Sequence, residues 1–244
     1  MEALDYSVSM GPFDDINLDR SVTVYTDQFR IYSADGADRA DGTPTTTSLC
    51  NLTASSDIFE SCHIGGLFYI ESSTDAISDT TIGKNGHIPA WQSSTDSTFA
   101  VGRFCRSDGK YYEDMKGTST GSTQPTWTAG AHVDGSDGTL WRYSNGGWGV
   151  ILITAVNSAT QAQGKILSEL PPSLIESTGA TYKWAFGDWS DAMGFPTKVA
   201  FYKGHLVFAG RHKLWFSVAS DYENFNPMTN GYEVGTDDGI NALC

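Results

Sequence analysis

Histidines are the residues to weigh first for metal binding or acid–base catalysis. The chain has five, and no two stand in an H-x-x-x-H or H-x-H pair, the spacings that bring two imidazoles together. The run "AHVDGSDG" (131–138) sets His132 beside two aspartates, which suggests a hydrolase or a calcium loop. It lacks the acidic twelfth position of an EF-hand. We interpret the run as a hairpin loop with turn-stabilising aspartates, and we expect no metal ion and no other cofactor.

Paired carboxylates would support a different chemistry, the hydrolysis of glycosidic bonds. Glu113 and Asp114 are adjacent, and Asp188 and Asp191 lie close together in a second aromatic-rich stretch. A glycosidase needs its two carboxyl groups at a defined separation in space, which the sequence leaves open. The chain has no G-x-S-x-G elbow, no Walker loop and no G-x-G-x-x-G. We therefore expect no catalytic residues and no enzymatic activity, and keep glycan cleavage as the weakest alternative.

Tryptophans offer a binding chemistry rather than a catalytic one. Trp127, Trp141 and Trp148 fall in one segment with several tyrosines. Flat aromatic side chains exposed on a β-sheet stack on sugar rings, whereas buried ones are ordinary core residues. The sequence leaves both open, so these three tryptophans are candidate sugar-stacking residues of a carbohydrate- or receptor-binding module.

The composition indicates which elements must position these residues. Among 244 residues only 18% are charged, 12% are aromatic, and 26 are glycine, which is typical of an all-β protein with many turns. The net charge of −14 disfavours a tight nucleic-acid binder, although it suits a protein that lets DNA pass without sticking. Intrinsic disorder is disfavoured by the aromatic content.

The cysteines and the apolar runs bear on the compartment. Cys50, Cys62, Cys105 and Cys244 form no C-x-x-C pair, which argues against a zinc knuckle. Cys50 and Cys62 could face each other across a hairpin, but buried free thiols in a reducing compartment are the simpler interpretation. "MEALDYSVSMGPF" is no signal peptide, and no apolar run is long enough for a membrane span. We expect a protein made and assembled in the cytoplasm.

Turn dipeptides divide the chain into short strands. Asp-Gly and Asn-Gly pairs such as Asp108-Gly109 and Asn145-Gly146 favour the positive φ angles of hairpin turns. The runs "SVTVYT" (21–26), "GGLFYIES" (65–72) and "GVILIT" (149–154) predict strands at least half buried. Only two short helical turns are expected, in 55–61 and in 166–177, the second limited by a Pro-Pro pair.

The strands group into three expected modules. We predict an N-terminal β module at 1–100, a second β module with aromatic-rich hairpins at 101–175, and the start of a propeller-like region at 176–244. The residues 71–98 are expected to form a long loop. Within the third module, "TKVAFYKGHLVFAG" predicts two antiparallel strands around Lys203-Gly204, followed by "KLWFSV". Its packing residues are expected to be Phe201, Leu206, Phe208, Trp215 and Phe225.

Several motifs point to one family. The segment 109–154 combines a Tyr pair, a Gly-containing loop, a Pro-Thr, an Asp-Gly turn before Trp-x-Tyr, and a Gly-Trp-Gly. The segment 170–210 continues with "WAFGDWS", a Gly-aromatic-Pro and "LVFAG", and "LWFSVASDYENF" follows it. Nearer the start stand "SMGPFDDINLD" (9–19) and "DIFESCHIGGLFYI" (57–70). Together these motifs resemble the tail nozzle proteins of podovirus-type bacteriophages, also called tail tubular protein B.

This resemblance implies a virion structural protein. Such proteins form a homo-oligomeric ring, a hexamer, below the portal and the adaptor, and DNA passes through the lumen. They combine β-barrel or β-sandwich modules with a β-propeller-like region, contact the tail adaptor and fibre proteins, and touch DNA only transiently. The implied fold class is therefore all-β and multi-module, located in the phage tail. Family members are much longer, so we expect this chain to be truncated within the propeller-like region.

Overall fold

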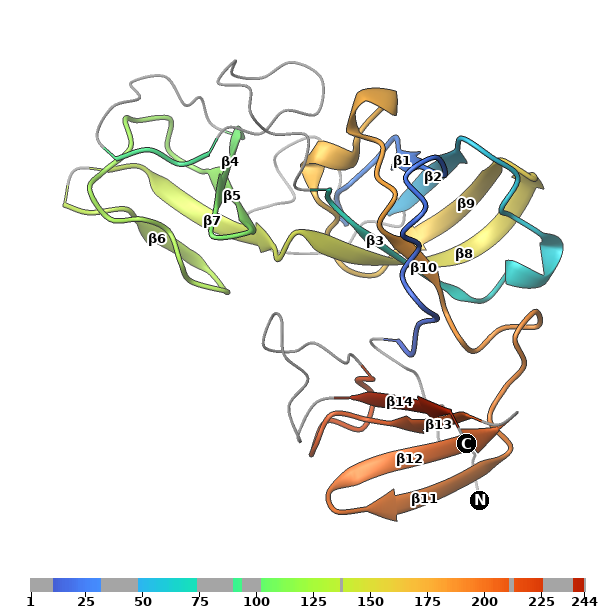
Figure 1. The fold of residues 1–244 in the computed structure, drawn as a ribbon. Coiled ribbons are helices and arrows are strands. Elements are labelled where there is room, and N and C mark those ends of the chain that lie inside the picture. The colour runs from blue at the N-terminus through green and yellow to red at the C-terminus, as the bar shows by residue number, and fades with distance from the viewer. Residues whose placement is uncertain are drawn as a thin grey trace.

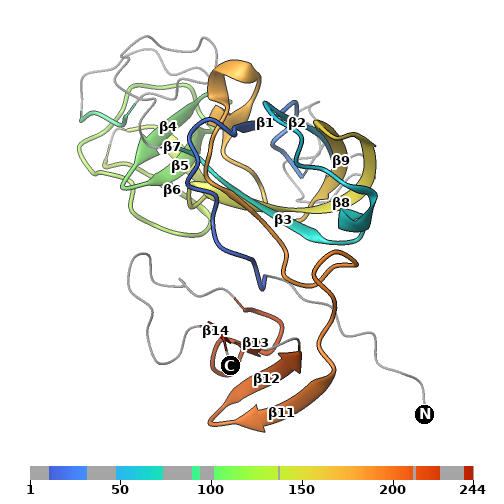
Figure 2. The same ribbon diagram turned by 45° about the vertical axis from the view of Figure 1, so that its right-hand side comes forward.

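The described part of the chain is all-β. The structure, a computed structural model, describes residues 11–31, 48–73, 90–93, 102–136, 138–210, 213–225 and 239–243. These residues form three antiparallel sheets, shown in Figures 1 and 2, and contain no α-helix. The all-β fold class expected from the sparse charges and dense turn signals is confirmed.

The largest sheet has six strands and curls into a half barrel. Its strand order is β1-β2-β9-β8-β3-β10, and the bounds are β1 Val24–Thr26, β2 Leu49–Ala54, β3 Leu67–Glu71, β8 Trp148–Ser158, β9 Gln161–Ile166 and β10 Trp184–Phe186. The pairing of β8 with β9 shifts register twice, between Ile153 and Ala155 and between Val156 and Ser158. Such bulges bend a strand and increase its twist, which accounts for the curl.

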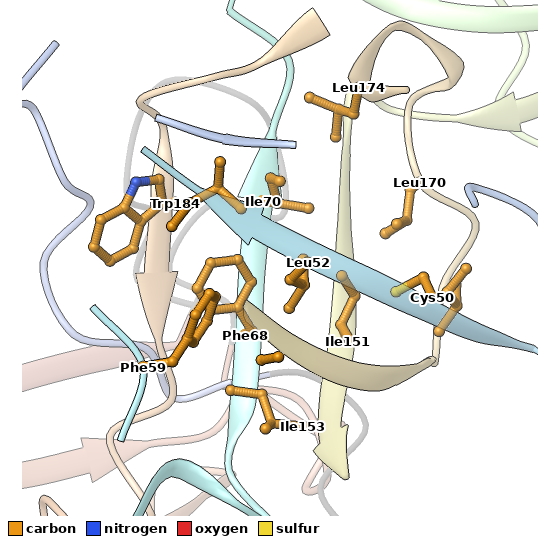
Figure 3. Packing of buried hydrophobic residues seen from close by; sticks show 14 residues of the cluster. Cys50, Leu52, Phe59, Phe68, Ile70, Ile151, Ile153, Leu170, Leu174 and Trp184 are labelled. Carbon is orange, nitrogen blue, oxygen red and sulfur yellow. The ribbon is translucent and has the colours of Figure 1, made fainter. Parts of the chain in front are cut away.

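The concave face of the half barrel holds the main core. Figure 3 shows Leu52 from β2, Phe68 and Ile70 from β3, and Ile151 and Ile153 from β8 converging there. Each strand contributes alternate residues because successive side chains point to opposite faces. The segment after β9 adds Leu170 and Leu174 to the same cluster. Burying this many aliphatic and aromatic groups is the chief source of stability for the sheet.

The second sheet has the order β4-β5-β7-β6. Its strands are β4 Phe104–Ser107, β5 Lys110–Asp114, β6 Ala131–Val133 and β7 Leu140–Asn145. Within this sheet Arg142 of β7 lies 2.7 Å from the buried Glu113 of β5, and it also lies 3.3 Å from Glu169, in the segment that follows β9. Arg30, from the segment after β1, lies 3.3 Å from Glu113. Arg30 and Arg142 therefore connect the second sheet to segments that follow strands of the first sheet.

The third sheet is a meander of four consecutive strands. Its order is β11-β12-β13-β14, with β11 Lys198–Tyr202, β12 His205–Gly210, β13 Lys213–Phe216 and β14 Ile240–Leu243. Both views place this sheet apart from the other two, below them in Figure 1. The predicted hairpin around Lys203-Gly204 and the following strand are confirmed.

The predicted helical turns are shorter than expected. Residues 55–57 form bends, 58–60 have no regular structure, and a 3-10 turn, η1, follows at Ser61–His63. The 166–177 segment holds the 3-10 turns η3, Pro172–Leu174, and the beginning of η4, Ser177–Gly179. The prolines restrict the segment as predicted, because each lacks an amide hydrogen for a longer helix.

The sheets divide the chain differently from the expected modules at 1–100, 101–175 and 176–244. β8, β9 and β10 belong to the first sheet, so the second sheet is an insertion between β3 and β8. The Asn145-Gly146 turn links the two sheets rather than closing a hairpin, because β7 and β8 do not pair. Most of the expected loop at 71–98 lies outside the described residues.

Candidate interaction surface

The hairpin of β11 and β12 forms because its turn residues suit a tight connection. Tyr202 pairs with His205, so the loop consists of only Lys203 and Gly204. Both adopt positive φ angles, 47° and 83° respectively, as the two-residue turn that matches strand twist requires. Glycine adopts such an angle without steric cost. The turn thereby fixes the register of the whole hairpin.

Every residue of β11 is exposed to solvent. Val199 is 62% exposed, Phe201 69% and Tyr202 56%, which is unusual for three large apolar or aromatic side chains on one short strand. Single exposed apolar residues are ordinary, but a contiguous group marks an interaction surface. The expectation that Phe201 packs inside the third sheet is therefore wrong.

The position of β11 in the sheet explains this exposure. Among the strands that the structure describes, β11 pairs only with β12 and so lies at the edge of its sheet. Phe201 contacts Tyr222, with ring centroids 5.3 Å apart, and both side chains are exposed. In contrast, Leu206, Trp215 and Phe225 are buried as predicted, and Phe208 contacts Phe225. The apolar face of the sheet is thus covered at its centre and open at β11.

The backbone of β11 is also open to a partner. In an antiparallel hairpin with a two-residue loop, Tyr202, Ala200 and Lys198 exchange hydrogen bonds with β12. The amide and carbonyl groups of the alternate residues, Val199 and Phe201, therefore point to the free edge. We call this free edge, residues 198–203, the β11 edge. It offers main-chain donors and acceptors together with apolar side chains, as strand addition needs.

Two lysines flank the β11 edge. Lys198 begins the strand, Lys203 follows it, and neither forms an ion pair within the described residues. The ammonium group of Lys203 lies 5.4 Å from the centre of the Tyr202 ring. The chain as a whole carries a net charge of −14, so this is a locally positive surface on an acidic protein. Lysines on an edge strand discourage uncontrolled pairing.

The sheet that presents this edge is firmly attached to the body. The ring of Trp189 contacts Phe208, Trp215 and Phe225 at centroid distances between 5.0 and 5.8 Å. The buried Asp188 accepts a hydrogen bond from the Trp215 indole and pairs with Lys213 at 2.7 Å. Aromatic packing and a buried charge pair therefore fix the orientation of the β11 edge.

The three candidate sugar-stacking tryptophans do not form one platform. Trp141 is fully buried, and its indole N–H donates to Asp134 at 2.9 Å, so the expectation that it could stack on a sugar is wrong. Trp127 is partly buried beneath His132, with ring centroids 5.0 Å apart. Trp148 is partly buried against Tyr69. Cross-strand packing, rather than ligand contact, accounts for most of their surface.

The candidate carboxylates have separate structural partners. Glu113 and Asp114 are consecutive on β5, so their side chains point to opposite faces of the strand. Glu113 pairs with arginines, whereas Asp114 accepts a hydrogen bond from Thr139 at 2.7 Å. Asp188 is buried, and Asp191 is exposed. Neither predicted pair presents two carboxyl groups to a common substrate position.

Metal-binding and membrane-spanning features are also missing from the part of the chain that the structure describes. Its His, Cys, Asp and Glu side chains form no group of three that could hold a metal ion. Cys50, Cys62 and Cys105 are free thiols. No helix in the described ranges is both long and apolar enough to cross a bilayer. The comparisons identify no relative: no protein-family model matches the chain, and no curated protein matches it.

The β11 edge was not predicted as a site, although the sequence carries a signal for it. In "TKVAFYKG" two lysines bracket four apolar or aromatic residues, and a turn glycine follows. Flanking lysines are characteristic of edge strands. The resemblance instead favoured a packing role for Phe201, because a strand with partners on both sides would bury that ring.

Proposed function

We propose that this chain is a structural building block of a bacteriophage tail, of the nozzle or tail-tip kind, and that it acts through self-assembly rather than catalysis. The observation that carries the proposal is the β11 edge, where three large side chains and unpaired backbone groups are exposed on one strand. A contiguous exposed group of this kind marks an interaction surface, and a subunit of a ring needs one. The motifs that resemble tail nozzle proteins supply the biological setting.

The body of the protein suits this mechanical role. The ion pair between Arg142 and Glu169 links the second sheet to the segment that follows β9, and the Asp188 contacts attach the third sheet. A subunit whose parts are fixed in this way holds a constant angle to its neighbours, which a closed ring requires. The acidic balance of the chain favours a conduit through which DNA slides without being retained.

The proposal includes the partners and the place that the resemblance implies. The chain would form a homo-oligomeric ring, a hexamer, in the tail of the virion after assembly in the host cytoplasm. The ring would continue the DNA channel, help to retain the genome, and offer its outer surface to adaptor and fibre proteins. A propeller-like role for the third sheet belongs to the same proposal, supported by its four-strand meander.

The oligomeric state of the purified protein tests the proposal. Native mass spectrometry and sedimentation velocity should show a defined oligomer whose population grows with protein concentration. Negative-stain electron microscopy should then show closed rings with a central channel. A protein that stays monomeric at the highest concentration that it tolerates would contradict the proposal, and so would open, polydisperse aggregates.

A further inference from the structure

A second exposed segment carries negative charge, which the β11 edge with its two lysines lacks. Residues 14–19, "DDINLD", carry three aspartates, at positions 14, 15 and 19. We call them the acidic segment. Its Leu18 is 77% exposed, more than any of the other large apolar side chains that the structure describes as exposed. The segment thus joins negative charge to an uncovered apolar group on the body of the protein.

The backbone of the acidic segment also has a free side. The segment runs along β10, because Asp14 N donates to Phe186 O at 2.9 Å and Asn17 N donates to Trp184 O at 2.8 Å. The amides of Ile16 and Leu18 have no hydrogen-bond partner in the described part of the chain. These two amides are two positions apart in the sequence, which is the spacing of neighbouring donors on one edge of a strand.

The two surfaces match in register when they are placed antiparallel. Pairing Val199 with Leu18 and Phe201 with Ile16 brings the free backbone groups of β11 opposite the free amides of the acidic segment. The same alignment sets Lys198 opposite Asp19 and Lys203 opposite Asp14. Opposite charges and apolar groups that face each other across an antiparallel pair both stabilise it. The same alignment therefore pairs opposite charges, apolar side chains and free backbone groups.

We propose that the β11 edge of one copy of the chain pairs with the acidic segment of a neighbouring copy. The two surfaces are different, so the contact is head-to-tail, and each copy keeps one of each surface for a further neighbour. Contacts of this kind close into rings when the rotation between copies permits. The inference rests on the proposed function, because it identifies the surfaces through which the proposed ring would form.

A symmetric pairing of β11 with itself is disfavoured by its charges. An antiparallel pair of two β11 strands would bring the lysines of both copies together without any acidic partner. Like charges on neighbouring strands destabilise their pairing. A partner strand with aspartates attracts the lysines of β11, whereas a second β11 strand repels them.

Two exposed positions allow a test that leaves the fold intact. Val199→Glu places a negative charge opposite the apolar Leu18 of the neighbour, and Leu18→Lys places a positive charge opposite the apolar Val199, so each leaves an unpaired charge in the contact. Each single variant should weaken association by about tenfold or more, measured by sedimentation velocity. The double variant Val199→Glu/Leu18→Lys should recover assembly, because its two introduced charges attract. Ile64→Lys, at another exposed apolar site, is the matched control and should assemble like the wild type.

Mixing the single variants separates this inference from its rivals. A mixture of Val199→Glu and Leu18→Lys should recover assembly with the two variants alternating, because each contact then joins either the two introduced charges or two unchanged surfaces. If the wild type forms an oligomer and Leu18→Lys forms the same oligomer equally well, this inference is wrong, but the proposed function is not contradicted. If Val199→Glu abolishes assembly and Leu18→Lys has no effect, two β11 strands pair symmetrically instead. A wild-type protein that never associates would overturn both.

Discussion

The indole N–H of Trp215 donates to Oδ2 of Asp188 at 2.8 Å, which ties strand β13 to the segment that follows β10. The other oxygen of this carboxylate lies 2.7 Å from the ammonium group of Lys213. Burial alone would lower the pKa of Lys213, but the hydrogen bond and charge of Asp188 outweigh it and raise that pKa. One buried carboxylate therefore secures the sheet that presents the β11 edge.

Removing this carboxylate should loosen the third sheet. Asp188→Ala leaves the buried indole N–H of Trp215 without its acceptor and leaves Lys213 only its longer contact, 3.4 Å, with Asp14. This should cost about 2 kcal/mol of unfolding free energy. Urea titration followed by tryptophan fluorescence would measure the loss. Asp191→Ala, at an exposed neighbouring position, is the control and should change stability little. Equal stability of the two variants would show that aromatic packing alone holds the sheet.

The hairpins were the part of the fold best predicted from sequence, because their cause is local. Asp108-Gly109 and Lys203-Gly204 close the β4–β5 and β11–β12 hairpins. By contrast, the hairpin between β8 and β9 turns at Ala159-Thr160 and carries no glycine signal. A turn can be predicted from the sequence where its positive φ angle favours a particular residue such as glycine.

The grouping of strands into sheets could not be predicted in the same way. Cys50 pairs with Gly164 and Phe68 with Ile151, each across about a hundred residues of chain. Nothing in a local pattern distinguishes this arrangement from sequential modules, because both bury the same apolar positions. The burial of Trp141 also depends on other parts of the chain, since it packs in one cluster with Cys105 of β4 and Tyr112 of β5.

The Asp108-Gly109 turn gives a clean test of backbone strain. Gly109 has a φ angle of 71°, and a Cβ added there would meet no atom within 4 Å. Gly109→Ala should therefore cost about 1 kcal/mol, entirely from the disfavoured backbone angle. Gly109→Asn should cost less, because asparagine tolerates the left-handed region. Thermal unfolding would rank the variants, and an alanine variant as stable as the wild type would contradict the assigned turn.

Asp134 should be a main determinant of the second sheet. This fully buried carboxylate accepts hydrogen bonds from the indole groups of Trp91 and Trp141, at 3.0 and 2.9 Å, and from the amide of Gly121. Asp134→Ala leaves all three donors without this acceptor and should cost about 3 kcal/mol. Near-ultraviolet circular dichroism would report the loosened Trp141 environment. Asp57→Ala, at an exposed position, should leave the spectrum unchanged, and an unchanged Asp134→Ala spectrum would refute the role.

The ion pairs between the first two sheets predict a specific pH dependence. Burial raises the pKa of Glu169 above its ordinary value of 4.5, and the attraction of Arg142 only partly opposes this. Because the folded state holds this proton more tightly than the unfolded chain does, Glu169 stabilises the fold fully below pH 4.5. It loses that contribution as the pH rises through its higher folded-state pKa.

Glu169→Gln isolates this effect, because glutamine resembles the protonated acid and does not titrate. The unfolding free energy of the wild type minus that of Glu169→Gln should be near zero in acid and should fall as the pH rises above about 4.5. Parallel urea titrations of both proteins across this range would measure it. A difference that instead grows with pH would mean that the Arg142 charge outweighs desolvation. The junction between the sheets would then depend on the ionised carboxylate of Glu169, and acid would weaken it.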